Sequence, residues 1–221
     1  MRQLALLLIV LASAFGQTSE VPYAPNSDAP GPTFANEQVL YSFPGTFSSI
    51  RKVDFRNLRF PSSDPILGSF SLKNVHYKHD ARDDHQSLDL DSIHYLGEST
   101  APSGDSALVL LCWFEAGGSS SQEGVARVFT LSGSRLRVVQ EIGWDTHFRA
   151  GRPTESFDPA TNTLVIRSAH YIPGDAHCCV SAMDVVTFRW DGARFVQTGI
   201  QTQLSEYGKA EGKTLPGAVA H

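Results

Sequence analysis

The densest group of ionisable side chains falls within ten residues, HYKHDARDDH, from His76 to His85. Its three histidines are His76, His79 and His85, and aspartates lie among them. Imidazole and carboxylate groups are ligands of zinc, copper and nickel, so the stretch predicts a divalent-metal site. The alternative is a polar hairpin tip, because a regular strand would place positions 76 and 79 on opposite faces.

A second chemically reactive group combines His177 with the adjacent Cys178 and Cys179, and a third cysteine, Cys112, lies in an apolar run. These side chains could bind a soft metal or exchange disulfides, but the Cys-x-x-Cys spacing of redox sites is absent. We therefore expect a structural disulfide between Cys112 and one of the adjacent pair. A Cys178–Cys179 bond is the strained alternative, because neighbouring Cα atoms are only ~3.8 Å apart and disulfides prefer ~4.4 to 6.8 Å.

Aromatic side chains in two irregular segments could form a surface that binds a carbohydrate or a peptide. The segment from Gly143 to Pro153 has neither strand nor helix periodicity, and the loop from Pro173 to Cys179 contains a Pro-Gly turn signal. Loops held by a rigid scaffold are common binding surfaces. The candidate surface residues are Trp144, His147, Phe148 and His177.

The common catalytic motifs are absent from the sequence. It contains no Gly-x-Ser-x-Gly elbow to expose a nucleophilic serine, and no His-Glu-x-x-His pair to place two zinc ligands on one helix face. Triads assembled from distant residues are recognised by geometry and not by spacing. A hydrolase of unrecognised type therefore stays an alternative.

The elements that must position these residues are β-strands. Apolar residues alternate with other residues in Leu164–Ala169 and Val185–Trp190, while Ala107–Phe114 is apolar on both faces. Asp191-Gly192 favours a tight hairpin after the second of these strands. About nine short strands and no long helix predict an all-β antiparallel meander. It could form a curled sheet, a barrel or a sandwich, with propeller-like blades as the alternative.

The chain divides into four segments by composition. Residues 1–16 have the basic start, apolar run and small-residue end of an export signal, and residues 17–36 form a Pro-rich segment expected to be a disordered tether. Residues 37–203 are expected to form a single β-rich domain, and residues 204–221 a loose tail. No other segment predicts a transmembrane helix, so the mature protein is expected to be periplasmic or secreted.

The sequence has a formal net charge of −5, whereas a nucleic-acid-binding protein usually carries an excess of basic residues. Nucleic acid is therefore excluded as an expected partner. A protein or a small ligand is the expected partner instead.

The Gly-Asp-x-His-Cys-Cys-x-Ser loop beginning at Gly174 is followed by a Phe-Arg-Trp-Asp-Gly-x-Arg-Phe hairpin beginning at Phe188. Over roughly Ala107–Gln201 the chain resembles the LppP/LprE-type family of bacterial exported proteins. Members often have proline after the cysteine pair, where Val180 stands here. Many are lipoproteins, but no lipid-attachment cysteine follows this leader. The resemblance implies export and no particular activity.

We expect a non-catalytic extracytoplasmic β domain that binds a ligand or partner through its loops. An exported metal-binding protein using His76, His79 and His85, and a hydrolase, are the alternatives. No cofactor is expected apart from the divalent metal of the first alternative.

Overall fold

The computed structural model describes residues 34–35, 41–60, 71–81, 84–96, 106–117, 119–145, 154–176 and 179–215. The predicted leader and most of the predicted tether lie outside these ranges, as do His147, Phe148, His177 and Cys178. The end of the predicted tether forms a short strand, Phe34–Ala35, which pairs with Ile142 and Glu141. The expectation that residues 17–36 are disordered throughout is therefore wrong at that end.

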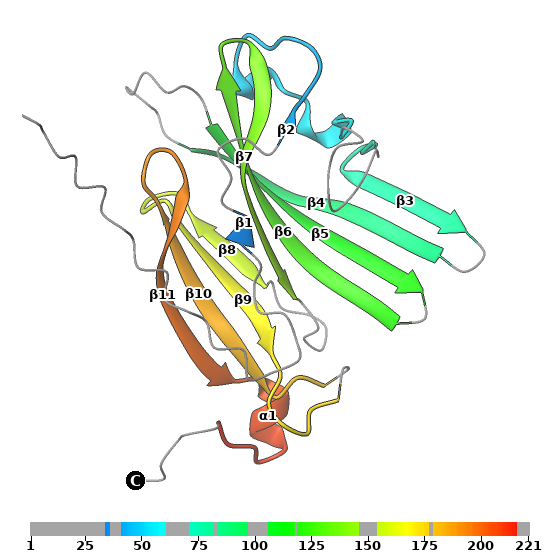
Figure 1. Ribbon diagram of the computed structural model, residues 1–221, viewed down its shortest axis with the longest axis vertical. Helices are drawn as coiled ribbons and strands as arrows, with labels where there is room; N and C mark the ends of the chain where they lie inside the picture. The colour runs from blue at the N-terminus through cyan, green and yellow to red at the C-terminus, as the bar shows by residue number, and fades with distance from the viewer. Residues whose placement is uncertain are drawn as a thin grey trace, which may run out of the picture.

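The predicted all-β antiparallel architecture is confirmed, and the described strands form two sheets (Figure 1). The larger, seven-stranded sheet has the order β1-β7-β6-β5-β4-β3, with β2 also on β7, and the four-stranded sheet has the order β11-β10-β9-β8. The strands of the larger sheet are β1 (Phe34–Ala35), β2 (Tyr41–Ser42), β3 (His76–Ala81), β4 (Asp84–Leu96), β5 (Ser106–Gly117), β6 (Ser119–Ser132) and β7 (Arg135–Asp145). Those of the smaller sheet are β8 (Glu155–Asp158), β9 (Thr163–His170), β10 (Ala182–Trp190) and β11 (Phe195–Leu204).

The hairpin predicted at Asp191-Gly192 is confirmed, although its loop is longer than a two-residue turn. Trp190 pairs with Phe195, so four residues connect β10 to β11. Asp191 Oδ1 accepts hydrogen bonds from the backbone N–H groups of Ala193 and Arg194, each at 2.8 Å. Gly192 has a φ of +103°, a backbone conformation that glycine adopts without strain.

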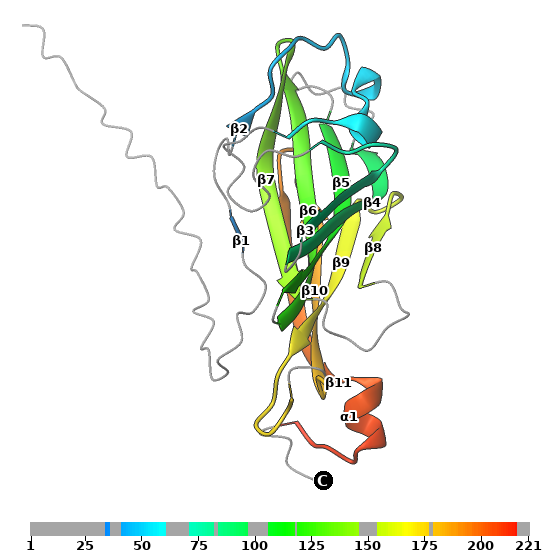
Figure 2. The same cartoon turned by 90° about the vertical axis from the view of Figure 1, so that its right-hand side faces the viewer.

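Two hydrophobic clusters divide the molecule into three layers (Figure 2). The first cluster lies between the two sheets; it comprises Leu96, Leu108, Leu110, Ala126, Val128, Ile142 and Trp144 from the larger sheet and Leu164, Ile166, Val186, Phe188 and Phe195 from the smaller. The second lies on the outer face of the larger sheet, beneath the N-terminal segment 43–60 with its two short 3-10 helices, η1 (Ile50–Lys52) and η2 (Phe55–Asn57).

A buried glutamine joins the two sheets directly. Gln140 on β7 is 2% exposed, and its side-chain Nε2 donates to the carbonyl oxygen of Phe195 at 2.8 Å. The backbone N–H of Phe195 in turn donates to Gln140 Oε1 at 2.7 Å. The amide side chain thus reproduces the pattern of a strand ladder between β7 and the start of β11, and it satisfies backbone groups that would be costly to bury alone.

The C-terminal segment is not the loose tail that we expected over residues 204–221. It contains the short helix α1 (Glu206–Ala210), which begins with a serine cap. Ser205 Oγ accepts a hydrogen bond from Gly208 N at 3.0 Å and donates to the carbonyl oxygen of Val180 at 2.6 Å. The backbone N–H of Ser205 donates to Ser181 O at 2.9 Å. The tail is therefore docked on the loop that precedes β10.

Replacing Ser205 with alanine is expected to lower the free energy of unfolding by about 1 to 2 kcal/mol, because both the helix cap and the bond to Val180 are lost. Urea denaturation of the full chain measures the change. Ser156→Ala, on an exposed position of β8, serves as the control and should change stability by less than about 0.5 kcal/mol. Equal stabilities for the two variants would show that α1 is not docked.

Candidate ligand site between the two sheets

β4 carries two acidic residues at a bulge, Asp89 just before it and Asp91 within it. Leu90 pairs with Leu111 and Ser92 pairs with Leu110, so Asp91 has no partner in the β5 register. Such a bulge changes which positions of a strand face each side. Leu88 before it accordingly lies in the outer cluster, whereas Leu96 lies in the cluster between the sheets.

Three carboxylates meet at this bulge: Asp89, Asp91 and Glu155, which we call the carboxylate cluster. The pKa of Asp91 is raised from its ordinary value of 3.8 to about 6. The first cause is loss of hydration to the surrounding protein, although the side chain still reaches solvent; the negative charges of Glu155 and then Asp89 add to it. Among the residues that the structure describes, no lysine or arginine forms an ion pair with any of the three. The basic side chain that pairs with the cluster within the described residues is His76, whose Nδ1 lies 2.5 Å from Asp89 Oδ1.

The carboxylate of Glu155 is positioned from the neighbouring sheet. Trp144 Nε1 on β7 donates to Thr154 Oγ1 at 3.1 Å, and Thr154 Oγ1 donates to Glu155 Oε2 at 2.6 Å. The indole ring lies over Gly124 on β6, where a Cβ atom would come within 2.0 Å of it. Only glycine leaves space for the ring at that position.

The expectation that Trp144 is an exposed residue of an irregular loop is wrong. Gly143 pairs with Val125, β7 continues to Asp145, and Trp144 is 3% exposed within the cluster between the sheets. The preference of Gly143 for a turn is outweighed because the large indole surface of Trp144 is buried against Gly124. The other three residues of the predicted surface, His147, Phe148 and His177, lie outside the described ranges.

An imidazole and a hydroxyl lie just beyond the bulge. His94 Nε2 is 2.9 Å from Ser92 Oγ, and the His94 ring packs on Phe157 of β8 with the ring centroids 4.7 Å apart. Loss of hydration lowers the pKa of His94, so the imidazole is neutral at pH 7. A neutral imidazole beside a hydroxyl is the pairing of a general base with a nucleophile. Within the described residues, no carboxylate is bonded to Nδ1 of this histidine to complete a triad.

The backbone register does not bring the three predicted histidine ligands together. His76 pairs with Asp89, whereas His85 pairs with Asp80. Positions 76 and 85 therefore lie four residue steps apart, roughly 13 Å along the strands. Position 79 has the opposite parity to position 76. His76 Nδ1 lies 2.5 Å from Asp89 Oδ1 instead. In the described part of the chain, no three His, Cys, Asp or Glu side chains are placed to hold one metal ion.

The Gly-Asp-x-His-Cys-Cys-x-Ser loop has a frame built around Asp175. Its Oδ2 accepts hydrogen bonds from Ile172 N at 3.0 Å and Ser181 N at 2.9 Å, and its Oδ1 accepts one from Ser181 Oγ. Loss of hydration acts to raise the pKa of Asp175, but the bonds from Ser181 and Ile172 and the charge of Lys213 lower it overall. The aspartate and serine of this motif therefore have a structural role.

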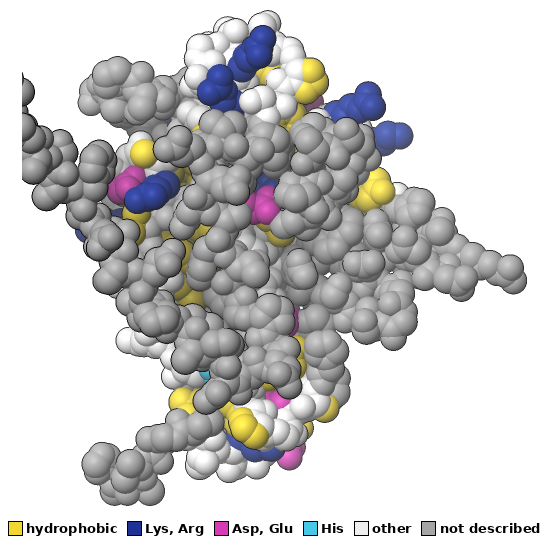
Figure 3. Space-filling view, viewed as in Figure 1, with side chains coloured by type: hydrophobic (Ala, Val, Ile, Leu, Met, Phe, Trp, Pro, Cys, Tyr) yellow, Lys and Arg dark blue, Asp and Glu magenta, His cyan; other side chains and the backbone are white. Residues whose placement is uncertain are grey.

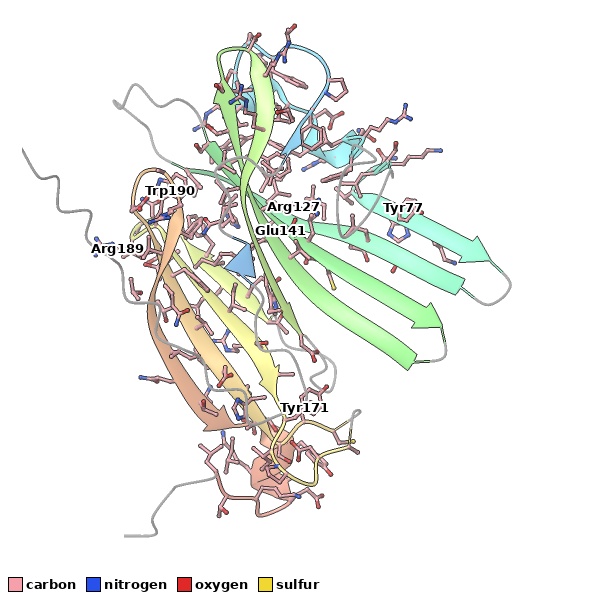
Figure 4. The ribbon with its side chains drawn as sticks, viewed as in Figure 1. Tyr77, Arg127, Glu141, Tyr171, Arg189 and Trp190 are labelled. Atoms are coloured by element: carbon pink, nitrogen blue, oxygen red, sulfur yellow. The ribbon has the colours of Figure 1, made fainter. Side chains whose placement is uncertain are left out.

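This frame lies close to the end of β7. Tyr171 Oη donates to Asp145 Oδ2 at 3.4 Å, and Figure 4 shows Tyr171 at the start of the loop. The described end of the segment Gly143–Pro153 therefore lies near the start of the loop Pro173–Cys179, with which it was predicted to share a surface.

Two of the predicted disulfide residues are described and one is not. Cys112 lies on β5, opposite Asp89, and Cys179 lies just before β10. No disulfide joins the residues that the structure describes. Because Cys178 lies outside them, a disulfide that includes it stays a prediction.

His170 is a structural residue of β9. Its Nδ1 lies 3.0 Å from Asp184 Oδ2, and Asp184 Oδ1 accepts a hydrogen bond from Thr202 Oγ1 at 2.6 Å. The pair links three strands of the smaller sheet. The carboxylate is 1% exposed and is therefore closed to a ligand.

No family model matches the chain, and no curated protein or solved structure matches it either. The resemblance carried by the cysteine loop therefore stays a prediction. Among the described residues, no helix has the length and apolar character needed to cross a bilayer.

The carboxylate cluster as a whole was not predicted from the sequence. Asp89 and Asp91 are two positions apart in a predicted strand, which is a signal for a shared face. Glu155, however, is 64 residues further along the chain than Asp91 and reaches them only because β8 lies against β4. Nothing in the local sequence indicates that contact.

Proposed function

We propose that this chain is an exported, non-catalytic binding module whose carboxylate cluster accepts an organic cation, an amine or a guanidinium. The observation that carries the proposal is the meeting of Asp89 and Asp91 of β4 with Glu155 of β8, which Thr154 orients, and the raised pKa of Asp91 agrees with it. A carboxyl with a strongly shifted pKa beside two like charges is unfavourable for the folded protein alone, and such groups concentrate at functional sites. A bound cation would remove the repulsion and favour the ionised form.

The chemistry of the surroundings favours an organic cation over a metal ion. The described residues hold no set of three ligands for one metal. Ammonium and guanidinium groups carry several N–H donors and can reach carboxylates that are too far apart to share a metal. Phe157 and His94 add a partly apolar wall beside the carboxylates, which suits the methylene groups of an alkyl amine.

Calorimetric titration of spermidine into the full-length exported protein tests the proposal. The affinity is expected to increase as the pH rises through about 6, because Asp91 must lose its proton to attract the cation. Below that pH the affinity should fall roughly tenfold for each unit. A neutral polyol of similar length should not bind.

The variant Asp91→Asn removes the titrating carboxyl and should weaken the binding of spermidine. Glu211→Gln makes the same change in net charge at an exposed position beyond α1 and is the matched control. It should leave both the affinity and its pH dependence unchanged. Binding of Ca²⁺ in place of spermidine, or spermidine binding that is equally tight on both sides of pH 6, would refute the proposal.

A hydrolase is the second candidate function, and the contact of Ser92 Oγ with the neutral imidazole of His94 favours it. Its test is covalent labelling with a fluorophosphonate, which reacts with activated serines. Labelling of the native protein that is lost in Ser92→Ala would establish this function. Equal labelling of the two proteins, or none, would exclude Ser92 as a nucleophile.

A further inference from the structure

The N-terminal layer carries an unusual concentration of positive charge for an acidic protein. Four exposed bases lie on this layer, a fifth lies on the segment 71–75 beside it, and the sixth begins β7. We call them the basic band: Arg51, Lys52, Arg56, Arg59, Lys73 and Arg135. Figure 3 shows the Lys and Arg side chains that project from the upper end of the molecule. This surface lies on the other side of the larger sheet from the carboxylate cluster.

Buried apolar residues hold the basic band rigidly in place. Between positions 50 and 60 the exposed bases alternate with apolar residues that enter the outer cluster; these are Ile50, Val53, Phe55, Leu58 and Phe60. The backbone is also anchored, since Val75 N donates to Arg56 O at 2.9 Å and Leu72 N donates to Leu58 O at 3.1 Å. The bases therefore stay in fixed positions, unlike the charges of a solvated linker.

The bases of the basic band are not paired with acidic residues in the part of the chain that the structure describes. None of its six side chains forms an ion pair with a described acidic residue, whereas Arg194 and Lys209 elsewhere on the surface pair with Asp191 and Glu206. Asp54, the acidic residue within the band, accepts a hydrogen bond from Asn57 Nδ2 at 2.9 Å instead. The guanidinium of Arg51 stacks 4.5 Å above the centre of the Tyr95 ring, which fixes its plane.

We propose that the basic band binds inorganic polyphosphate, a linear polyanion. Four of its six bases are arginine, whose planar fork of donors matches the oxygens of a phosphate. The bases are also spread over several successive elements: Arg51 and Lys52 lie on η1, Arg56 lies on η2, and segment 71–75 with Lys73 runs beside segment 55–59. Bases spread in this way suit the successive charges of a chain, whereas a single small anion would need them to converge.

The test is fluorescence anisotropy of labelled inorganic polyphosphate with the full-length exported protein, over a series of salt concentrations. The native protein should bind, and its affinity should fall steeply with salt because counterions are released from the polyanion. The triple variant Arg51→Gln/Lys52→Gln/Arg56→Gln should bind roughly a hundredfold more weakly at low salt. The slope of log affinity against log salt should shrink by about 2 to 3, or about 0.7 to 0.9 per lost contact.

The triple variant Arg189→Gln/Arg194→Gln/Lys209→Gln removes the same charge from exposed positions of β10, the β10–β11 loop and α1. It should bind as the native protein does. A second variant of the band, Arg59→Gln/Lys73→Gln, should lose affinity in parallel and guards against misfolding of the first. Equal losses in the control, or stronger binding to phosphatidylglycerol vesicles than to polyphosphate at equal phosphate, would overturn the proposal.

Discussion

Replacing Arg127 with methionine is expected to lower the free energy of unfolding by about 3 to 5 kcal/mol. Arg127 on β6 is fully buried, and its Nε lies 2.5 Å from Glu141 Oε2 on β7, which is also buried (Figure 4). Its guanidinium also lies 5.1 Å from the centre of the Phe60 ring in the N-terminal layer. Methionine fills part of the space but leaves the Glu141 carboxylate without its positive partner. Urea denaturation followed by tryptophan fluorescence measures the loss.

Two further variants separate the buried charge from a simple change of packing. The double replacement Arg127→Met/Glu141→Leu removes both charges and should recover most of the lost stability. Arg194→Met breaks an exposed pair with Asp191 and should cost less than about 1 kcal/mol. If Arg127→Met alone were as stable as the native protein, the pair would not join the N-terminal layer to the sheet as we describe.

Asp91→Asn is expected to raise the stability of the protein above pH 6 while weakening spermidine binding about 10- to 100-fold. The folded pKa of Asp91 lies above its ordinary value, so the folded state holds this proton more tightly than the unfolded state does. Stability therefore falls as the pH rises from 3.8 to about 6, and the deficit is complete above that range. Asparagine cannot ionise and should recover about 1 kcal/mol there, after allowance for solvent screening.

The opposite signs of these two effects distinguish a binding residue from a structural one. A carboxylate that held the fold together would destabilise the protein when replaced, whereas a binding residue is commonly maintained at a cost to stability. Thermal unfolding of both proteins across the pH range measures the change in stability, and calorimetry measures the change in spermidine affinity. A destabilised Asp91→Asn variant with native affinity would assign Asp91 to the fold alone.

The strand content of this protein could be predicted because alternation of apolar residues is a local property. The runs in β9 and β10 and the loop at Asp191 all followed from residues within a few positions of one another. The doubly apolar run in β5 indicated a central strand, and Leu108, Val109 and Leu111 are buried on its two faces.

Contacts between distant segments could not be predicted in the same way. The glycine- and serine-rich stretch after Phe114 has the composition of a loop, yet β5 extends to Gly117 and β6 begins at Ser119, because the two strands pair with each other there and β4 pairs with the other side of β5 as far as Ala116. Trp144 was misplaced for a related reason, since its burial depends on Gly124 in another strand. The mixed apolar and basic residues before Phe60 show neither strand nor helix periodicity, because they cover a face of the sheet as an irregular layer.

The ionisation of Asp91 in the presence and absence of a cation tests the proposed binding site most directly. The carboxyl-carbon chemical shift of Asp91, followed by NMR through a pH titration, reports its pKa in the full-length protein. We expect Asp91 to have a pKa of about 6 in the protein alone and a clearly lower pKa with saturating spermidine. An Asp91 pKa that is the same with and without spermidine would contradict it.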